Sequence, residues 1–265
     1  MGAALDPASI PLALREAVDP FSAWAEDAGL NATHVAEQAL VDSWLVRFAN
    51  SRAKRARSVN AIGAGLLPLD EKLERAQALC DAAGLPLTIR ITPFSQPTGL
   101  DTALAARGFV AFEASCVMGR ALTPGVPAVS ELPLHEVDAR EFSETAGRLY
   151  GDDAARIVVD TARNLAFPGH GIRLLLGERA APLAVGSVLF DGCMAGFYGI
   201  HTRSDVRGRG YAATIIETLL ERSQTAGARY ACLQVGAGNN AARALYCKFG
   251  FTDRYAYWYR ARQIE

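Results

Sequence analysis

The stretch DVRGRGYAA, residues Asp205–Ala213, decides the fold of this chain, because it joins a strand pattern to a helix pattern. The preceding residues 195–202 are apolar and aromatic with few charges, which predicts a strand. After the stretch, apolar residues recur at helical spacing, and Gly227 marks the expected end of the helix. Glycines at such a turn let the backbone approach a ligand, and the start of the helix offers unpaired N–H groups. The stretch therefore predicts a site for a phosphate or pyrophosphate.

Three other interpretations of this turn are possible. The spacing of Gly208, Gly210 and Ala213 also fits the G-x-G-x-x-G/A pattern of dinucleotide-binding proteins. That pattern expects an acidic residue at the end of the next strand, but the strand predicted at 230–235 runs into Gly236. No G-x-x-x-x-G-K-[ST] run is present, which excludes a P-loop. A tight strand–helix turn that binds nothing is the remaining alternative.

The C-terminal sequence favours a ligand-binding turn. Residues 239–251, NNAARALYCKFGF, predict a short helix that begins at an asparagine cap and ends at a glycine. A last strand is expected through 255–259. Together with the Arg-x-x-Gly-x-Ala run at Arg207–Ala212, this pattern resembles the GNAT superfamily of N-acetyltransferases, and the resemblance covers about Val129 to Arg262. It implies the GNAT fold, an α/β structure with a mixed sheet.

The resemblance also implies a ligand and its contacts. Acetyl-CoA would be the acyl donor, with no metal ion. Backbone N–H groups of Gly208–Ala213 would cradle the coenzyme A pyrophosphate, and the strand Ile200–Thr202 would pair with the pantetheine arm. The cofactor-binding residues implied in this way are Ile200, His201, Thr202, Arg207, Gly208, Arg209, Gly210, Tyr211, Ala212, Ala213, Asn239 and Tyr246.

Catalysis of acyl transfer needs a proton donor for the leaving thiolate and a base for the amine. By the resemblance, the Tyr246 hydroxyl faces the thioester sulfur, and a tyrosine with a pKa near 10 stays protonated at neutral pH. A core-packing role is the alternative for Tyr246. Many family members carry a glutamate as base where this chain has Gln234, which cannot accept a proton. His201 is the candidate base, directly or through water, against a role as a hydrogen-bonding residue of the sheet. Asp205 and Glu178 are remoter candidates.

The first half of the chain repeats the order of elements of the second half. A helix, a glycine, a strand, a helix and a Gly-Phe pair follow one another in both halves, the pairs being Gly108-Phe109 and Gly250-Phe251. This order predicts two tandem GNAT-like halves, residues 1–122 and 129–265, joined by a Pro- and Gly-containing linker at 123–128. A coincidence of common α/β element order is the alternative. We expect the first half to be degenerate, because it lacks the key residues and has instead Gly63–Pro68 without arginines, Pro97 for Asn239 and Leu104 for Tyr246.

Within the first half, helices are expected at 25–30 and 34–40, and paired strands at 44–48 and 58–62. The basic run Arg52–Arg57 lies between these strands. It is short and has no interleaved aromatic residues, so we interpret it as a solvated hairpin tip rather than a nucleic-acid patch.

Composition excludes several classes of protein. The 265 residues carry a formal net charge of −1, which gives no reason to expect a nucleic-acid partner. No apolar run reaches the roughly 18 residues of a membrane span, and the N-terminus does not resemble a signal peptide. Five scattered cysteines predict reduced thiols and a cytoplasmic protein. Cys247 is interpreted as a packing residue rather than a nucleophile, because no acid–base partner lies near it in sequence.

These observations favour an acetyl-CoA-dependent N-acetyltransferase that transfers its acetyl group directly to a primary amine of a small molecule or a peptide. Two alternatives stay open: a non-catalytic acyl-CoA-binding sensor, and an acyltransferase that uses a longer acyl-CoA. The chain is expected to be a monomer or a homodimer without a membrane partner. The sequence does not indicate which amine is the acceptor.

Overall fold

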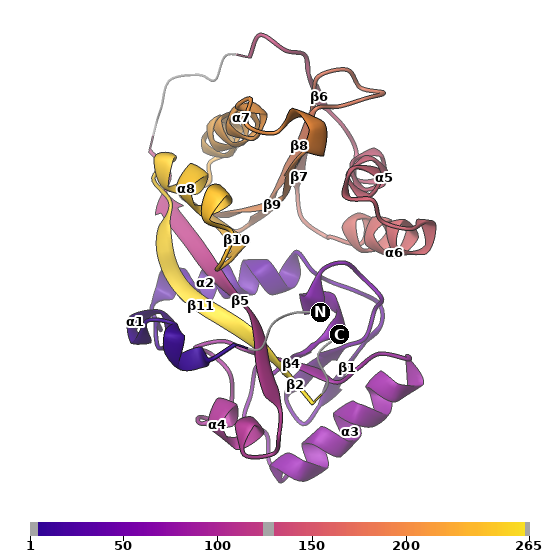
Figure 1. The fold of residues 1–265 in the computed structure, drawn as a ribbon, viewed down its shortest axis with the longest axis vertical. Helices are drawn as coiled ribbons and strands as arrows, with labels where there is room; N and C mark the ends of the chain where they lie inside the picture. The colour runs from indigo at the N-terminus through magenta and orange to yellow at the C-terminus, as the bar shows by residue number, and fades with distance from the viewer. Residues whose placement is uncertain (1–4, 124–129, 263–265) are drawn as a thin grey trace.

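The computed structural model describes residues 5–123 and 130–262, and in these residues one mixed sheet runs through both halves of the chain. The order of its strands is β1-β2-β3-β4-β11-β5-β10-β9-β8-β7-β6 (Figure 1). The elements of the first half are α1 Leu12–Arg15, α2 Pro20–Asn31, β1 Gln38–Val41, β2 Trp44–Arg47, β3 Val59–Asn60, α3 Leu69–Ala82, β4 Thr88–Ile91, α4 Leu100–Ala105 and β5 Val110–Ala121. Those of the second half are β6 Leu134–Glu136, α5 Ala139–Tyr150, α6 Ala154–Leu165, β7 Gly171–Leu176, β8 Ala184–Asp191, β9 Met194–Thr202, α7 Tyr211–Thr225, β10 Tyr230–Gly236, α8 Asn240–Lys248 and β11 Thr252–Ala261.

Both halves follow one plan. In the first, the antiparallel strands β1, β2 and β3 lead through α3 to β4, which is parallel to β3. In the second, β7, β8 and β9 lead in the same way through α7 to β10, which is parallel to β9. A short helix and a long last strand then complete each half. The predicted mixed sheet and tandem order are therefore present in the structure.

The last strands of the two halves cross over at the centre of the sheet. β5 lies between β11 and β10, and β11 lies between β4 and β5, all in antiparallel pairs (Figure 1). Each half thus places its last strand beside the parallel strand of the other half. The halves share one sheet, and the predicted linker lies, except for Thr123, outside the described residues.

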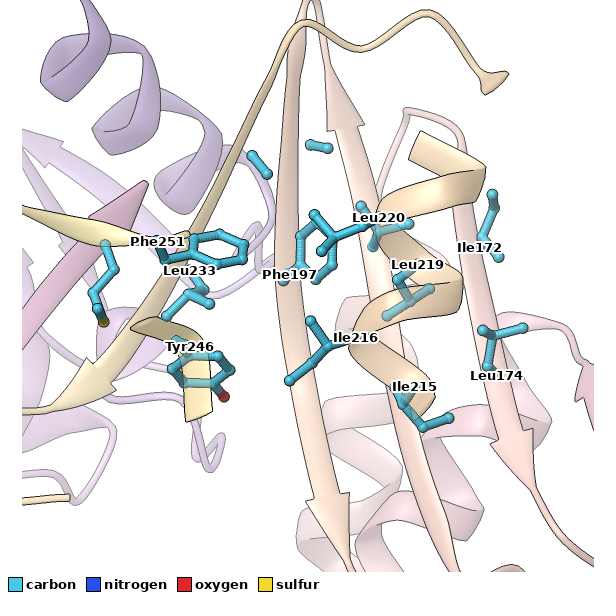
Figure 2. Close-up of a cluster of buried hydrophobic side chains, with 14 of the residues drawn as sticks. Ile172, Leu174, Phe197, Ile215, Ile216, Leu219, Leu220, Leu233, Tyr246 and Phe251 are labelled. Atoms are coloured by element: carbon cyan, nitrogen blue, oxygen red, sulfur yellow. The ribbon is translucent and has the colours of Figure 1, made fainter. Parts of the chain in front are cut away.

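The core of the second half forms between α7 and the strands that it covers. Ile215, Ile216 and Leu219 on α7 are fully buried against the sheet, together with Phe197 and Leu233 (Figure 2). Each such aliphatic side chain stabilises the fold by roughly 1.5–3 kcal/mol when it leaves water. A second cluster around Trp44, Ile89 and Trp258 fills the first half, and Trp258 reaches it from β11. Burial in both halves thus depends on the crossed strands.

Three expectations about the elements need correction. Residues 34–40 do not form a helix, because Gln38–Val41 pairs with β2 through a tight turn at Asp42 and Ser43. The strand β6 was not predicted. The basic run is not a solvated tip, because tertiary contacts fold it into a short 3-10 turn at Lys54–Arg57 that packs between the halves, with Arg55 half-buried. The other predicted elements agree with the structure to within a few residues.

Within residues 5–123 and 130–262, no helix combines the length and apolar character needed to cross a bilayer.

Candidate functional site

The site begins where the parallel strands β9 and β10 separate. Their pairing starts at Met194 and Tyr230 and stops at Phe197 and Leu233, although β9 continues to Thr202. A bulge causes β9 to bend, because its pairing with β8 shifts by one residue at Gly199, which has φ +63°. The ends of β9 and β10 therefore leave backbone groups unpaired on either side of a wedge.

A cavity of about 360 Å³ fills this wedge. Its walls are the ends of β9 and β10, the start of α8, and side chains from the first half. The residues that matter below are Arg55, Tyr150, Tyr198, Gly199, Ile200, Gln234, Asn239, Tyr246 and Tyr257. The structure thus brings together Ile200, Asn239 and Tyr246 of the residues predicted from the sequence.

Tyr246 presents a protonated hydroxyl to this cavity. Its ring is 8% exposed and packs edge-on against Phe251, with 6.1 Å between ring centroids. Figure 2 shows the hydroxyl oxygen at the edge of the apolar cluster, directed away from Phe251 and Leu233. Burial raises the pKa of Tyr246 to about 12. No described residue forms a hydrogen bond with this hydroxyl, so it is available to a ligand in the cavity.

Asn239 begins helix α8 and lies on the wall of the cavity. Its Oδ1 accepts a hydrogen bond from the Ala242 N–H at 3.2 Å, which satisfies one of the unpaired groups at the start of the helix. The Asn239 amide nitrogen is left for a ligand. The local sequence was sufficient to predict this cap.

The turn before α7 is an open cradle of N–H groups. Gly210 caps the helix with φ +86°, and no side chain caps it. Among the described residues, the N–H groups of Tyr211, Ala212 and Ala213 have no hydrogen-bond acceptor. Atoms added at Cβ of Gly208 or Gly210 would meet nothing within 4 Å. Arg207 and Arg209 are exposed beside the cradle, which therefore fits an anion.

The matching turn of the first half is already filled. The Asp42 carboxylate accepts hydrogen bonds from the N–H groups of Leu66 (2.9 Å) and Leu67 (2.8 Å). These two bonds hold the pKa of Asp42 below its usual range. Lys72 lies 3.2 Å from the same carboxylate. The chain's own carboxylate thus occupies the position that an anion would take, and the open cradle is the one in the second half.

His201 lies outside the wall of this cavity and outside that of a second cavity described below. Its ring meets Tyr150 edge-on, with 4.6 Å between centroids, and it is on the wall of neither cavity. Burial, together with the charges of Arg207 and Arg52, lowers the pKa of His201 below 6.5, so the ring is neutral at pH 7. Thr202, the other predicted contact on this strand, also lies outside the cavity walls.

Gln234 stands where a base would be expected, and it is held by two neighbours. It accepts a hydrogen bond from the Tyr257 hydroxyl at 2.8 Å and another from Arg55. Gln234 is therefore part of a fixed polar wall and transfers no proton.

A second cavity, of about 280 Å³, adjoins the first. It lies between α5 and α6 of the second half and residues 32–33 and 52–55 of the first half. Both cavities are lined by Arg55, Tyr150, Tyr198 and Gly199, so they meet at the bulge of β9. Two ligands, one in each cavity, would therefore meet beside the bulge of β9.

Arg55 is the site residue that the sequence analysis missed. It lies 179 residues from Gln234 in the chain, and only the folded sheet brings the two together. The basic run Arg52–Arg57 was the available signal in the sequence, but nothing in its composition predicted that Arg55 would be partly buried. Of the residues that the structure describes, no three His, Cys, Asp or Glu side chains are grouped to hold a metal ion. Cys247 is exposed on α8 and lines neither cavity.

Comparison with known proteins agrees with this geometry. Residues 144–251 match the model of the acetyltransferase (GNAT) family. The fold is similar to that of a GCN5-related N-acetyltransferase from Kribbella flavida, with a TM-score of 0.64 at 17% sequence identity over 92% of this chain and 95% of that one. It is also similar to a tandem GNAT protein from the clavulanic acid biosynthesis pathway, with a TM-score of 0.55 at 18% identity over 74% of this chain and 70% of that one. No curated protein sequence matches the chain. The predicted GNAT fold is confirmed.

Proposed function

We propose that the chain transfers an acetyl group from acetyl-CoA to a primary amine, from the premise that residues 144–251 match the acetyltransferase (GNAT) family. The family supports acyl transfer in general. The observation that carries the finer proposal is a path along the chain: β9 forms one wall of the wedge where the Tyr246 hydroxyl is available, and it leads directly to the open cradle at α7.

Coenzyme A would bind along this path. The N–H groups of Tyr211, Ala212 and Ala213 would receive the pyrophosphate, with Arg207 and Arg209 beside them. Unpaired backbone groups of Ile200–Thr202 would bind the pantetheine arm as an added strand would. The arm would then bring the thioester into the wedge beside Tyr246.

The chemistry follows from the groups at the meeting point. A neutral amine attacks the thioester carbonyl, and the C–S bond breaks as the tetrahedral intermediate collapses. Tyr246 donates its proton to the leaving thiolate, and N–H groups at the end of β9 stabilise the oxyanion. The amine proton passes to a base. We propose His201 for this role, acting only through water, because its ring contacts Tyr150 but lines neither cavity, and because Gln234 cannot accept a proton.

An amine panel tests the proposal. Acetyl-CoA is incubated with the protein and each amine in turn, and release of free coenzyme A thiol is measured against a reaction without amine. We expect thiol release that depends on both protein and amine. Binding of coenzyme A without thiol release from any amine would support the sensor instead. Absence of coenzyme A binding would contradict both.

A further inference from the structure

The second cavity has an excess of positive charge. Its walls carry four guanidinium groups and two carboxylates, namely Arg52, Arg55, Arg163, Arg173, Asp152 and Asp160. Arg52 pairs with Asp152 at 2.6 Å, and Arg163 pairs with Asp160 at 3.2 Å. In the described part of the chain, no carboxylate pairs with Arg55 or Arg173. These two cations of the cavity therefore form no ion pair, although the charge of Asp138 acts on Arg173 and that of Glu26 on Arg55.

Arg55 lies where the two cavities meet. Its Nη1 donates to Gln234 and, at 3.3 Å, to the Tyr257 hydroxyl, while its Nε donates to Thr33 at 3.2 Å. These bonds fix the plane of the guanidinium. The Nη2 group forms no hydrogen bond with any described residue. A fixed guanidinium whose Nη2 group is free can donate to a carboxylate, and the interaction is stronger where water is partly excluded.

Other groups around Arg55 strengthen the positive field. Arg47 is buried nearby, and its pKa falls to about 10 because of burial and the charges of Arg55, Arg90 and Arg163. Arg90 is compensated by Glu26, with 2.9 Å between Nη2 and Oε2. Among the described residues, the Arg47 side chain hydrogen-bonds only to the neutral Leu30 carbonyl and Gln38 amide. The positive charge that forms no ion pair is therefore concentrated around Arg55.

We propose that the acceptor is a free α-amino acid, whose carboxylate binds Arg55 while its amine meets the thioester. This rests on the proposed function. One carbon separates the amine and the carboxylate of an α-amino acid, so a carboxylate bound at the junction leaves the amine beside the bulge of β9. A free α-amino acid fits best, because only there is the anion adjacent to the reacting nitrogen.

The test compares acids with their amides. Glycine, L-alanine, L-phenylalanine and L-glutamate are each assayed beside the matching α-carboxamide, and kcat/KM is expressed per neutral amine to remove the difference in amine pKa. We expect at least one acid to exceed its amide by about tenfold or more, the size of one charged hydrogen bond. Amides that match or exceed all four acids would overturn the inference while the proposed function stands.

Variants test whether Arg55 is responsible for the preference for acids over amides. Arg55→Gln is expected to remove most of the acid-over-amide ratio, and Arg55→Lys to retain part of it. Arg75→Gln is the matched control, because Arg75 loses the same charge on the exposed face of α3, where it pairs with Glu71. Loss of the ratio in the control, or an unchanged ratio in Arg55→Gln, would contradict the assignment.

A binding measurement covers the case in which Arg55→Gln does not fold. Calorimetry with N-acetylglycine and N-acetylglycinamide is expected to show tighter binding of the acid by the unaltered protein. Arg55→Lys, which keeps the charge but loses the fixed planar guanidinium, should weaken only the binding of the acid. Equal binding of both compounds would refute carboxylate recognition. If no amine of any kind releases thiol, the proposed function itself fails, and this inference fails with it.

Discussion

Whether Tyr246 has a catalytic or only a structural role depends on its hydroxyl group. If it protonates the thiolate, Tyr246→Phe keeps the ring against Phe251 and removes only the donor. Positioned proton transfer contributes roughly 100- to 10,000-fold, so we expect turnover to fall at least about tenfold. Affinity for coenzyme A should stay nearly constant, because the pyrophosphate contacts lie on α7. Steady-state kinetics and calorimetry measure the two quantities.

The neighbouring Cys247→Ala supplies the control for this prediction. Cys247 is exposed on the same helix and should leave turnover unchanged. A Tyr246→Phe protein with unaltered turnover, measured where chemistry limits the rate, would remove Tyr246 from the mechanism.

His201 makes a prediction about pH. Its pKa lies below 6.5 in the folded protein, so the ring is neutral and able to accept a proton at pH 7. As the pH falls through that lowered pKa, protonation removes the base, and turnover should decline. His201→Gln should lower turnover at neutral pH by at least about tenfold and flatten this acid limb. An unchanged pH profile would show that His201 only packs against Tyr150.

How far residues can be predicted from sequence depends on the range of their contacts. Asn239 and Tyr246 belong to one short helix, so a local motif was enough to find them. Arg55 was misread because its partners, Gln234 and Tyr257, belong to distant strands. The role of Arg55 depends on how the two halves pack against each other, and no local sequence pattern predicts that packing.

At the scale of elements, the sequence predicted strand β9 but not its bend. Residues 195–202 were expected as a strand, and β9 spans Met194–Thr202. The bulge at Gly199 depends on the register against β8, which is set across the sheet. An added Cβ at Gly199 would also lie only 3.3 Å from Phe142. The position of the wedge was therefore beyond a prediction from local pattern.

The turn before α7 gives a test at the same scale. Gly210→Val places a branched side chain where the pyrophosphate would lie, and we expect coenzyme A affinity to fall at least about tenfold, a loss of roughly 1.4 kcal/mol. The substitution also strains the backbone, because φ is +86°. Calorimetry measures the affinity, and thermal unfolding measures the strain.

Gly227→Val is the matched control. It has φ +85° at the other end of α7, and an added Cβ there meets nothing within 4 Å. Both variants should lose similar stability, but only Gly210→Val should lose affinity. Gly65, in the first half, would be a poor control, because an added Cβ would collide with Asp42. Equal affinity loss in both valine variants would point to general destabilisation.

For the whole molecule, the repeated order of elements predicted two halves but not their crossed last strands. β5 and β11 follow their own Gly-Phe pairs at similar distances, so nothing in the local sequence distinguishes pairing within a half from pairing across halves. The structure places β5 beside β10 and β11 beside β4. The position of the site residues of the second half therefore depends on β5, a strand of the first half.

This arrangement predicts that the second half does not fold alone. Residues 129–265 contain the whole cradle, but without β5 the strand β10 loses its partners Ser115–Ala121 and β11 loses its partners Val110–Gly119. We expect this piece to show no cooperative thermal unfolding and no coenzyme A binding by calorimetry. Co-expression with residues 1–122, which supply β5, should restore both, and the intact chain should unfold in one transition. A piece 129–265 that binds coenzyme A by itself would show that the second half is independent of the crossed strands.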